Sequence, residues 1–220
     1  MAYIDFIQKI HTGTKRNYLQ RVVDFDKAGL AKVGKEFGRD YFDGERQYGY
    51  GGYKYDGRWV QFARDLSMHY DLKAGDRVLD VGCAKGFLLY DFTQVVPGVE
   101  VAGIDVSSYA IETAKEEVKP FLQVANATGL PFPDKSFDFV VSINTLHNLR
   151  IYDLAKALRE LERVSRRSKY IILDGYRTEE EKVNLMYWQI TCECFFTPEE
   201  WEWIFKQVGY SGDFACIYYE

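Results

Sequence analysis

The sequence predicts an α/β fold, in which a doubly wound, mostly parallel sheet carries helices on both faces. From residue 77 onward, short β-branched or aromatic runs alternate with segments of helical periodicity. The first of these runs ends in a small-residue turn that opens a helix. Strands separated by helices of this length are typical of parallel strands joined by right-handed crossovers, so we expect an open sheet.

The N-terminal third is a different kind of sequence. Residues 3–35 carry apolar side chains at roughly helical spacing and predict one or two helices, and residues 59–70 show a helical pattern again. Between them, residues 38–58 have no period and are rich in Tyr and Gly, which predicts a long loop. We therefore expect one domain over residues 1–220, with a helical cap and lid at 1–72 and a Rossmann-like core at 73–220.

The core elements follow in alternating order. Ligands of such sheets bind at the carboxyl ends of the strands, near the topological switch point. The expected strands are 77–81, 99–105, 121–125, 137–143, 170–174 and 214–219, and the expected helices are 86–95, 108–118, 151–165, 179–191 and 198–208.

Composition excludes several classes of protein. The chain has 220 residues, 47% hydrophobic and 28% charged, and no apolar run that approaches twenty residues, so we expect a globular domain that does not span a membrane. The N-terminus lacks the pattern of a secretory signal, and the four cysteines are irregularly spaced, which favours a cytoplasmic protein with reduced thiols. A net charge of −5 argues against a nucleic-acid surface.

A nucleotide-type site is predicted where the first core strand ends. Residues 78–86 read as a buried strand followed by a turn of small residues, and Gly82 and Gly86 would let a ligand approach the backbone. Asp105 lies at the end of the next strand, where a carboxylate can accept both hydroxyls of a ribose. The turn is not G-x-G-x-x-G and no basic residue directly follows Asp105, so a dinucleotide is disfavoured.

The stretch from residue 76 to 148 resembles class I S-adenosylmethionine-dependent methyltransferases. DVGCAKG at 80–86 resembles motif I of that family, GIDVS at 103–107 its acidic-loop motif, and residues 126–149 its third and fourth motifs. The resemblance implies S-adenosyl-L-methionine as cofactor and S-adenosyl-L-homocysteine as product. It also implies these roles: Gly82 and Gly86 beside the methionine and ribose portions, Asp105 on the ribose, Val106, Asn126 and Ala127 around the adenine, and Asn144 near the methionine.

Two positions depart from the pattern of that family. Ala84 stands where the family usually has glycine, which requires that this residue keep a negative φ. Asn126 stands where the family often has Asp, and its carboxamide can still accept and donate hydrogen bonds. The family also usually ends in a hairpin of two strands, whereas residues 209–220 have room for one full strand and a stub. If only one strand forms, we expect it to lie antiparallel beside the fifth.

His147 is the candidate catalytic residue. It follows the fourth core strand, where this fold points residues at the transferring methyl group, and a histidine there could take a proton from an acceptor hydroxyl or amine. A lone histidine is more often structural, which is how we interpret His11 and His69. Three scattered histidines and the pair Cys192 and Cys194 do not match zinc spacing, so no metal is expected.

The Tyr/Gly-rich segment, residues 38–58, is a candidate lid. Glycines would make it mobile, and tyrosines would supply contact area and cation–π stabilisation for a sulfonium. A solvated surface loop is the alternative. For Trp188, after the fifth strand, a place in an acceptor pocket and one in a buried helix explain the sequence equally well. The candidate residues are Tyr53 and Arg58 for the cofactor, and Tyr41, Tyr50, Arg46 and Trp188 for the substrate, with Arg58 or Arg46 pairing with the methionine carboxylate or an anionic acceptor.

The leading functional hypothesis is methyl transfer to an oxygen or nitrogen of a small molecule by direct SN2 displacement. The alternatives are an RNA or DNA methyltransferase, a non-catalytic cofactor-binding partner subunit and, last, a nicotinamide oxidoreductase. Residues 40–59 and 209–220 resemble a methyltransferase subgroup associated with bacterial surface polysaccharide biosynthesis. That resemblance implies a sugar-linked or polysaccharide-precursor acceptor. We also expect no nucleic-acid or membrane partner, and a homodimer is the oligomer we consider.

Overall fold

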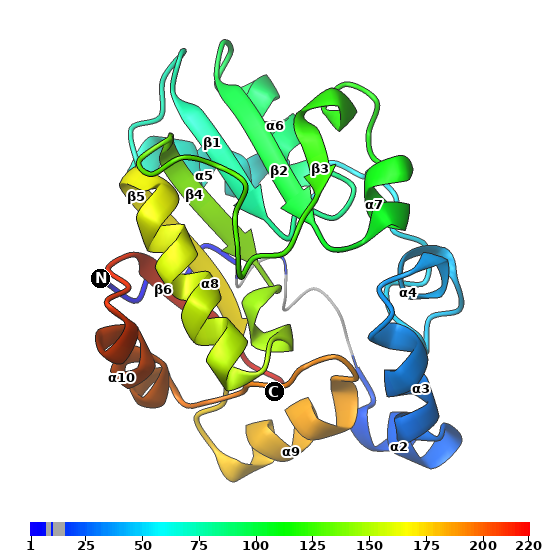
Figure 1. Ribbon diagram of the computed structural model, residues 1–220. Helices are drawn as coiled ribbons and strands as arrows, with labels where there is room; N and C mark the ends of the chain where they lie inside the picture. The colour runs from blue at the N-terminus through cyan, green and yellow to red at the C-terminus, as the bar shows by residue number, and fades with distance from the viewer. Residues whose placement is uncertain (8–9, 11–15) are drawn as a thin grey trace.

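The computed structural model describes residues 1–7, 10 and 16–220, and its centre is a six-stranded sheet (Figure 1). The strand order is β3-β2-β1-β4-β5-β6, and every pair of neighbours is parallel. This confirms the predicted fold class. The strands are β1 (Arg77–Val81), β2 (Glu100–Asp105), β3 (Leu122–Val124), β4 (Phe137–Ile143), β5 (Ser165–Asp174) and β6 (Asp213–Ile217).

Helices cover both faces of this sheet because its strands are apolar on both sides. Val78 and Val141 belong to the hydrophobic cluster shared with α5 (Val60–His69) and α6 (Phe87–Val95). Leu79 and Val140 belong to the cluster shared with α8 (Ile151–Val164) and α10 (Pro198–Val208). In Figure 1, α8 and α10 lie in front of the sheet and α5 and α6 behind it. A sheet buried on both faces explains why its strands read as continuous apolar runs rather than alternating ones.

The remaining helices lie around the carboxyl ends of the strands. In Figure 1, α3 and α4 stand to the side of the strand ends, and α9 lies below them, where it contacts α2. Asn17 and Asp26 cap the amino ends of α2 and α3 through their side-chain oxygens. These elements are α2 (Tyr18–Asp24), α3 (Lys27–Gly34), α4 (Arg39–Asp43), α7 (Ser108–Glu112), α9 (Glu179–Trp188) and the 3₁₀ turn Leu146–Asn148. A second 3₁₀ turn, Lys119–Phe121, precedes β3 at its amino end.

Several element boundaries differ from those predicted. The helix expected over 108–118 ends at Glu112, because Lys115 N–H donates to the carbonyl of Lys85 instead of continuing the helix. The segment 38–58 contains the short helix α4. The helix expected over 59–70 is α5, which packs beside α6 in the layer behind the sheet. His11 lies outside the described residues.

The last strand was predicted to be antiparallel, and that prediction is wrong. The β6 strand pairs with β5 in parallel, because α10 returns the chain along the sheet before β6 begins. The outer edge of β6 is occupied by the start of the chain: Ile4 N–H donates to the carbonyl of Phe214 at 2.9 Å, and Phe214 N–H donates to the carbonyl of Ala2 at 3.0 Å. These bonds satisfy backbone groups that an open sheet edge would leave unpaired.

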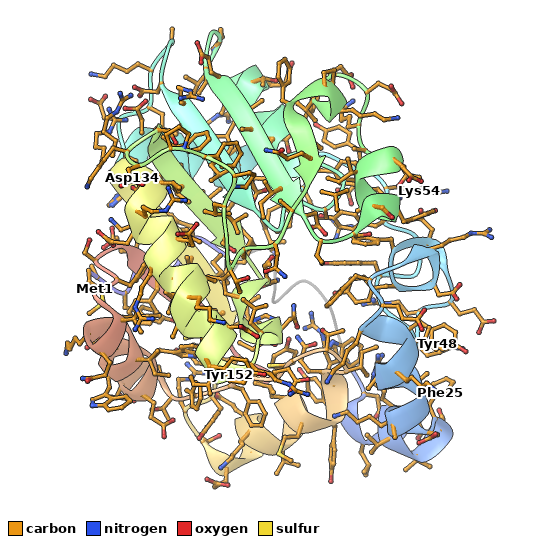
Figure 2. The ribbon with its side chains drawn as sticks, in the orientation of Figure 1. Met1, Phe25, Tyr48, Lys54, Asp134 and Tyr152 are labelled. Atoms are coloured by element: carbon orange, nitrogen blue, oxygen red, sulfur yellow. The ribbon has the colours of Figure 1, made fainter. Side chains whose placement is uncertain are left out.

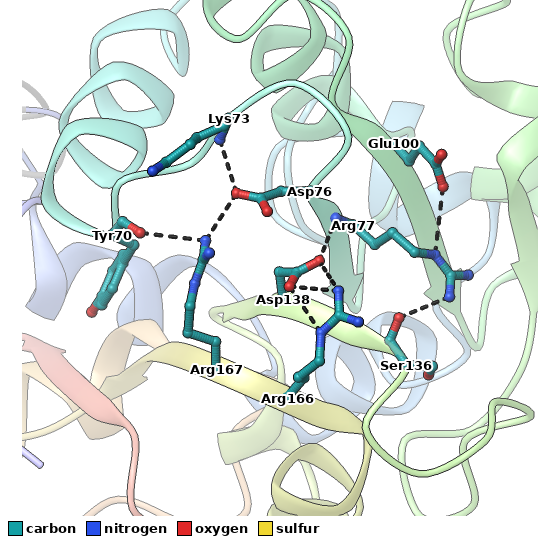
Figure 3. Close-up of polar contacts among 9 residues, drawn as sticks. All are labelled: Tyr70, Lys73, Asp76, Arg77, Glu100, Ser136, Asp138, Arg166 and Arg167. Atoms are coloured by element: carbon teal, nitrogen blue, oxygen red, sulfur yellow. Dashed lines mark hydrogen bonds and ion pairs between the residues drawn. The ribbon is translucent and has the colours of Figure 1, made fainter.

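A cluster of charged groups ties the amino ends of the strands together (Figure 3). The carboxylate of Asp138, on β4, accepts from Arg77 N–H at 3.0 Å and from Arg166 Nε and Nη2 at 2.5 to 2.9 Å. Nearby, Asp76 accepts from the side chain of Arg167 at 2.9 Å. This cluster lies at the end of the sheet opposite the carboxyl ends of the strands.

We expect Asp138→Asn to lower the free energy of unfolding by about 2 kcal/mol, because it removes a charge-assisted interaction of a buried carboxylate that joins β1, β4 and β5. Urea denaturation measures the change. Asp134→Asn is the matched control, since the carboxylate of Asp134 is 74% exposed in its ion pair with Arg163 and exposed pairs contribute below about 1 kcal/mol. Equal effects of the two substitutions would contradict the prediction.

Candidate active site

The turn after β1 is shaped by glycine at two positions. Gly82 has φ 85°, and a Cβ there would lie 2.1 Å from Thr145 Oγ1, so both conformation and space exclude a side chain. Gly86 has φ 74° and begins α6, where a Cβ would approach Val118 and Leu122 at 2.8 to 2.9 Å. Gly82 therefore keeps the end of β1 open, whereas Gly86 sets the close packing of the helix that follows.

Ala84 corrects an expectation, because its φ is +48° and not negative. This left-handed conformation costs an L-residue roughly 1–2 kcal/mol. It turns Ala84 N–H toward the carboxylate of Asp105, which accepts at 2.8 Å. The bond offsets part of the cost and joins the turn after β1 to the end of β2.

Asp105 is placed to bind a pair of hydroxyls. Its Oδ2 accepts from Ala84 N–H and its Oδ1 from Ser107 N–H at 2.8 Å. A carboxylate oxygen can accept a further hydrogen bond. Burial raises the pKa of Asp105, and the amide hydrogen bonds from Ser107 and Ala84 act in the opposite direction. The carboxylate is thus fixed in orientation and retains acceptor capacity.

A cavity of about 290 Å³ lies over this turn. It brings together residues from the ends of β1, β2 and β4, the segment after β3, and the Tyr/Gly-rich segment. Of the candidates named for the cofactor, two lie outside its lining: Gly86 and Arg58. Their contacts with the cofactor stay predictions. The candidates that do line it are Tyr53, Gly82, Asp105, Val106, Asn126, Ala127 and Asn144.

The polar atoms of this cavity fit an amino-acid-bearing nucleoside. Three buried oxygens among its lining residues have no hydrogen-bond partner within the described part of the chain: Asp80 Oδ1, Asn144 Oδ1 and Asn148 Oδ1. A buried unsatisfied acceptor is costly, so a ligand with ammonium or hydroxyl donors would stabilise the site. Asn126 also lines the cavity, and its carboxamide oxygen accepts from Thr128, which orients the side chain. Asp105 and these acceptors together suit the ribose and amino groups of S-adenosyl-L-methionine.

Asp80 is a site residue that the candidate set missed, although it lies in motif I. It is 4% exposed at the end of β1 and lines the cavity. Burial, and then the charge of Asp105, raise its pKa to about 8. At neutral pH without ligand, Asp80 is therefore largely protonated. The sequence contains Asp80 within motif I, but only the structure shows that its Oδ1 atom is buried without a hydrogen-bond partner in the described part of the chain.

The pKa of Asp80 predicts a pH-dependent stability. Between the unfolded-state value near 4 and the folded-state value of about 8, the unfolded chain is ionised and the folded one is protonated. The contribution of Asp80 to folding therefore falls as pH rises through this window. We expect Asp80→Asn to gain stability relative to the parent protein between pH 5 and pH 8. Urea denaturation without cofactor at pH 5 and pH 8 measures the free energies of unfolding of both proteins. An equal change with pH in the variant and the parent protein would contradict the prediction.

The Tyr/Gly-rich segment folds over the cavity through its aromatic rings. Tyr50 and Tyr53 lie 4.4 Å apart between ring centroids, and Tyr53 stacks on Phe87 of α6 at 4.9 Å. Tyr41, Tyr50 and Tyr53 all line the cavity. Figure 2 shows Tyr48 and Lys54 on the outer side of the segment. Tyr41, Tyr50 and Tyr53 thus face the cavity, whereas Tyr48 faces outward.

A buried lysine fastens this segment to the core. Lys85, in the turn after β1, is 6% exposed, and its Nζ lies 2.6 Å from the carboxylate of Asp43, the last residue of α4. The hydroxyl of Tyr109, on α7, donates to the same carboxylate at 2.8 Å. Sequence reasoning did not single out these three residues, because they meet only when α4 lies against the turn and α7.

Asp43→Asn removes the charge that pairs with buried Lys85, so we expect the Tyr/Gly-rich segment to open more often. Amide hydrogen exchange should show protection in residues 39–53 reduced about tenfold, which corresponds to about 1.4 kcal/mol, within the range for a hydrogen bond to a charged group. Asp40→Asn, an exposed carboxylate on the same helix, is the control and should leave exchange unchanged. Unchanged protection in Asp43→Asn would contradict the role of this pair.

A second cavity, of about 220 Å³, adjoins the first. The two share five lining residues: Tyr41, Tyr50, Tyr53, Trp59 and Asn144. Four candidate residues line the second cavity and not the first. They are Arg46, Arg58, His147 and Trp188. The candidates thus separate into a cofactor-side group and a group on the other side of the three tyrosines.

His147 is held by its surroundings. It is 2% exposed, its Nδ1 accepts from Asp174 N–H at 3.0 Å, and its Nε2 lies 3.5 Å from Asp174 Oδ2. Burial lowers the pKa of His147, and the charge of Asp174 acts in the opposite direction. Both ring nitrogens are thus directed at Asp174 at the end of β5. The role of His147 as a general base stays a prediction, and these contacts assign the ring a part in joining the end of β4 to β5.

The arginines of the second cavity differ in their partners. Arg58 is paired with Asp56, whose carboxylate accepts from its Nε at 2.8 and 2.9 Å. Arg46 donates to the carbonyl of Gly49 and lies over the ring of Trp188 at 5.7 Å. The expectation that Arg58 binds the methionine carboxylate stays a prediction. His69, which we interpreted as structural, contacts the rings of Phe6 and Tyr70.

No group of three or more His, Cys, Asp or Glu among the described residues could hold a metal ion. No helix in the described part of the chain is long and apolar enough to cross a membrane.

Comparison with known proteins identifies the region that carries the cofactor motifs. Residues 79–173 match the family described as "Methyltransferase domain". The demethylmenaquinone methyltransferase of Symbiobacterium thermophilum is 34% identical over 116 residues, which are 49% of this chain and 45% of that protein. The 27-O-demethylrifamycin SV methyltransferase of Amycolatopsis mediterranei is 33% identical over 102 residues, 43% of this chain and 36% of that protein. The chain thus spans less than half the length of these two relatives.

A solved structure supports the fold. The YcgJ protein of Bacillus subtilis superimposes with a TM-score of 0.54 at 23% identity, over 67% of each chain. The match extends the shared architecture beyond residues 79–173. Residues 79–173 are therefore similar to a methyltransferase domain, the chain has the class I methyltransferase fold, and these matches imply S-adenosyl-L-methionine as the methyl donor.

Proposed function

We propose that this protein transfers a methyl group from S-adenosyl-L-methionine to an oxygen or nitrogen of a small molecule, by direct SN2 displacement. The observation that carries the proposal is the pair of adjoining cavities, one beside Gly82 and Asp105 and one beyond Tyr41, Tyr50 and Tyr53. A donor in the first cavity and an acceptor in the second would meet at the residues that line both.

The protein's contribution in this proposal is orientation and exclusion of water. S-adenosyl-L-methionine supplies, when bound, an electrophilic methyl group on a sulfonium. Asp105 and Asp80 would hold its ribose and amino groups, and the three tyrosines would cover it. Methyl transfer depends chiefly on holding the reactants in line, which such a covered site can provide.

Asn144 is the residue best placed to orient the acceptor. It follows β4 with φ 55°, lines both cavities, and its carboxamide oxygen is buried without a partner in the described part of the chain. An acceptor hydroxyl or amine could donate to this oxygen. The site then needs no strong base for an amine with a free lone pair, which is consistent with the hydrogen bond that His147 Nδ1 already accepts from Asp174 N–H.

The relatives leave the class of acceptor open. Their names include demethylmenaquinone and 27-O-demethylrifamycin SV, so a quinone-type acceptor is a second candidate beside the sugar-linked acceptor of the polysaccharide hypothesis. The aromatic rings of Trp59 and Trp188 in the second cavity would suit a ring-bearing acceptor. The family match covers residues 79–173, whereas Arg46 and Trp188 lie outside it, so the acceptor does not follow from the family.

Asp105→Ala tests the proposed function. We expect it to lower the affinity for S-adenosyl-L-homocysteine at least tenfold, because it removes a charged hydrogen-bond acceptor. Calorimetry measures this affinity. Asp65→Ala, at a half-buried carboxylate of α5 that lines neither cavity, is the matched control and should bind as the parent protein does. Absence of binding to the parent protein at millimolar concentration would overturn the proposal.

The remaining alternatives have their own measurements. A nucleic-acid target would show measurable affinity in filter binding with a steep negative salt dependence. A non-catalytic partner subunit would support its partner's activity even with Asp105 replaced. The homodimer stays a prediction, which sedimentation of the purified protein tests.

A further inference from the structure

We propose that the acceptor carries a phosphoryl group, which the arginines of the second cavity bind. This rests on the proposed function and deepens it by naming the substrate class. The residues are Arg21 and Arg46, with Arg16 and Arg58 on the same walls.

The arginines converge on one aromatic ring. The guanidinium carbons of Arg21, Arg16 and Arg46 lie 4.6, 5.4 and 5.7 Å from the ring centroid of Trp188, at the end of α9. They come from α2, from the residues before it and from the Tyr/Gly-rich segment. Three cations from separate parts of the chain therefore face a single space. A guanidinium group can contact an aromatic face and still donate hydrogen bonds from its edge.

The charge of this cavity is unbalanced. Among its described lining residues there are four arginines and no Asp or Glu. Arg58 has Asp56 as a partner. Arg21 donates through Nη2 to the carbonyl of Gln47 at 2.8 Å, and within the described residues neither Arg21 nor Arg46 pairs with a carboxylate. Burial and the mutual repulsion of these groups lower the pKa of Arg21 and of Arg46. An anion in the cavity would relieve this repulsion.

A phosphoryl group fits this arrangement better than a single carboxylate. It carries a charge of about −1.5 to −2 and three acceptor oxygens, and guanidinium groups bind such oxygens with paired N–H donors. Arg21 Nε is buried and has no hydrogen-bond partner in the described part of the chain, so it is a donor in need of an acceptor. An uncharged quinone would leave these donors unsatisfied.

The arginines belong to the acceptor side because none of the four lines the cofactor cavity. The tyrosines at 41, 50 and 53 separate them from Asp105 and Asp80. An anionic group held near Trp188 would leave the rest of an acceptor directed toward Asn144, which lines both cavities. Binding of the phosphoryl group would thus also set the direction from which the acceptor approaches the methyl donor.

Pyrophosphate is the probe that tests this inference. The protein is saturated with S-adenosyl-L-homocysteine and titrated with pyrophosphate, and with malonate at equal ionic strength, by calorimetry and thermal shift. We expect pyrophosphate to raise Tm and to bind at least tenfold more tightly than malonate. Arg21→Gln and Arg46→Gln should each lower the affinity for pyrophosphate at least tenfold. Both variants should keep an affinity for S-adenosyl-L-homocysteine within twofold of the parent protein. Arg64→Gln, an exposed arginine of α5, is the matched control.

Other outcomes would overturn it in distinguishable ways. Competition between pyrophosphate and S-adenosyl-L-homocysteine would assign the arginines to the methionine carboxylate of the cofactor. Equal binding of malonate, or pyrophosphate binding that both variants retain, would overturn the phosphoryl assignment alone. Failure of S-adenosyl-L-homocysteine to bind would overturn the proposed function. Arg21→Lys keeps the charge without the planar pair of donors, and an affinity for pyrophosphate equal to that of the parent protein would contradict recognition by paired guanidinium donors.

Discussion

The carboxylate of Asp105 is the contact on which the site depends. It accepts from the backbone of Ala84 and of Ser107, at 2.8 Å in each case, and so joins the turn after β1 to the end of β2. That link holds Ala84 at a positive φ and keeps the turn open beside Gly82. A ligand bound to Asp105 would therefore contact a carboxylate that the turn itself has already oriented, with little further ordering on binding.

Charge is divided between the two sides of the site. Asp80 and Asp105 lie at the strand ends, where burial raises the pKa of both. Arginines crowd around Trp188 on the other side. Aromatic rings of the Tyr/Gly-rich segment lie between the two, and Lys85 fastens that segment through Asp43. The arginine side therefore carries positive charge that suits an anionic acceptor, whereas the strand-end side offers carboxyl groups as hydrogen-bond partners for the methyl donor.

Features that depend on residues close together in the sequence were predictable, and features that depend on distant residues were not. Strand and helix positions in the core depend on local periodicity, and the order of β1, α6 and β2 with Asp105 at its end was predictable for that reason. The conformation of Ala84 was not, because it depends on a bond to a residue 21 positions away. The direction of β6 depends on the path of α10, and the start of the chain covers its edge through Ile4 and Ala2, contacts that span more than 200 residues.

The fold class, the place of the cofactor motifs and the tyrosine-rich segment could be predicted from the sequence, because glycine turns, apolar periodicity and a terminal acid are encoded over short spans. The division of the candidates between two cavities could not. It depends on tertiary contacts, which place His147 against Asp174 and bring Arg21 and Arg46 to Trp188. Burial and the meeting of like charges are properties of the packed chain, and no spacing along the sequence specifies them.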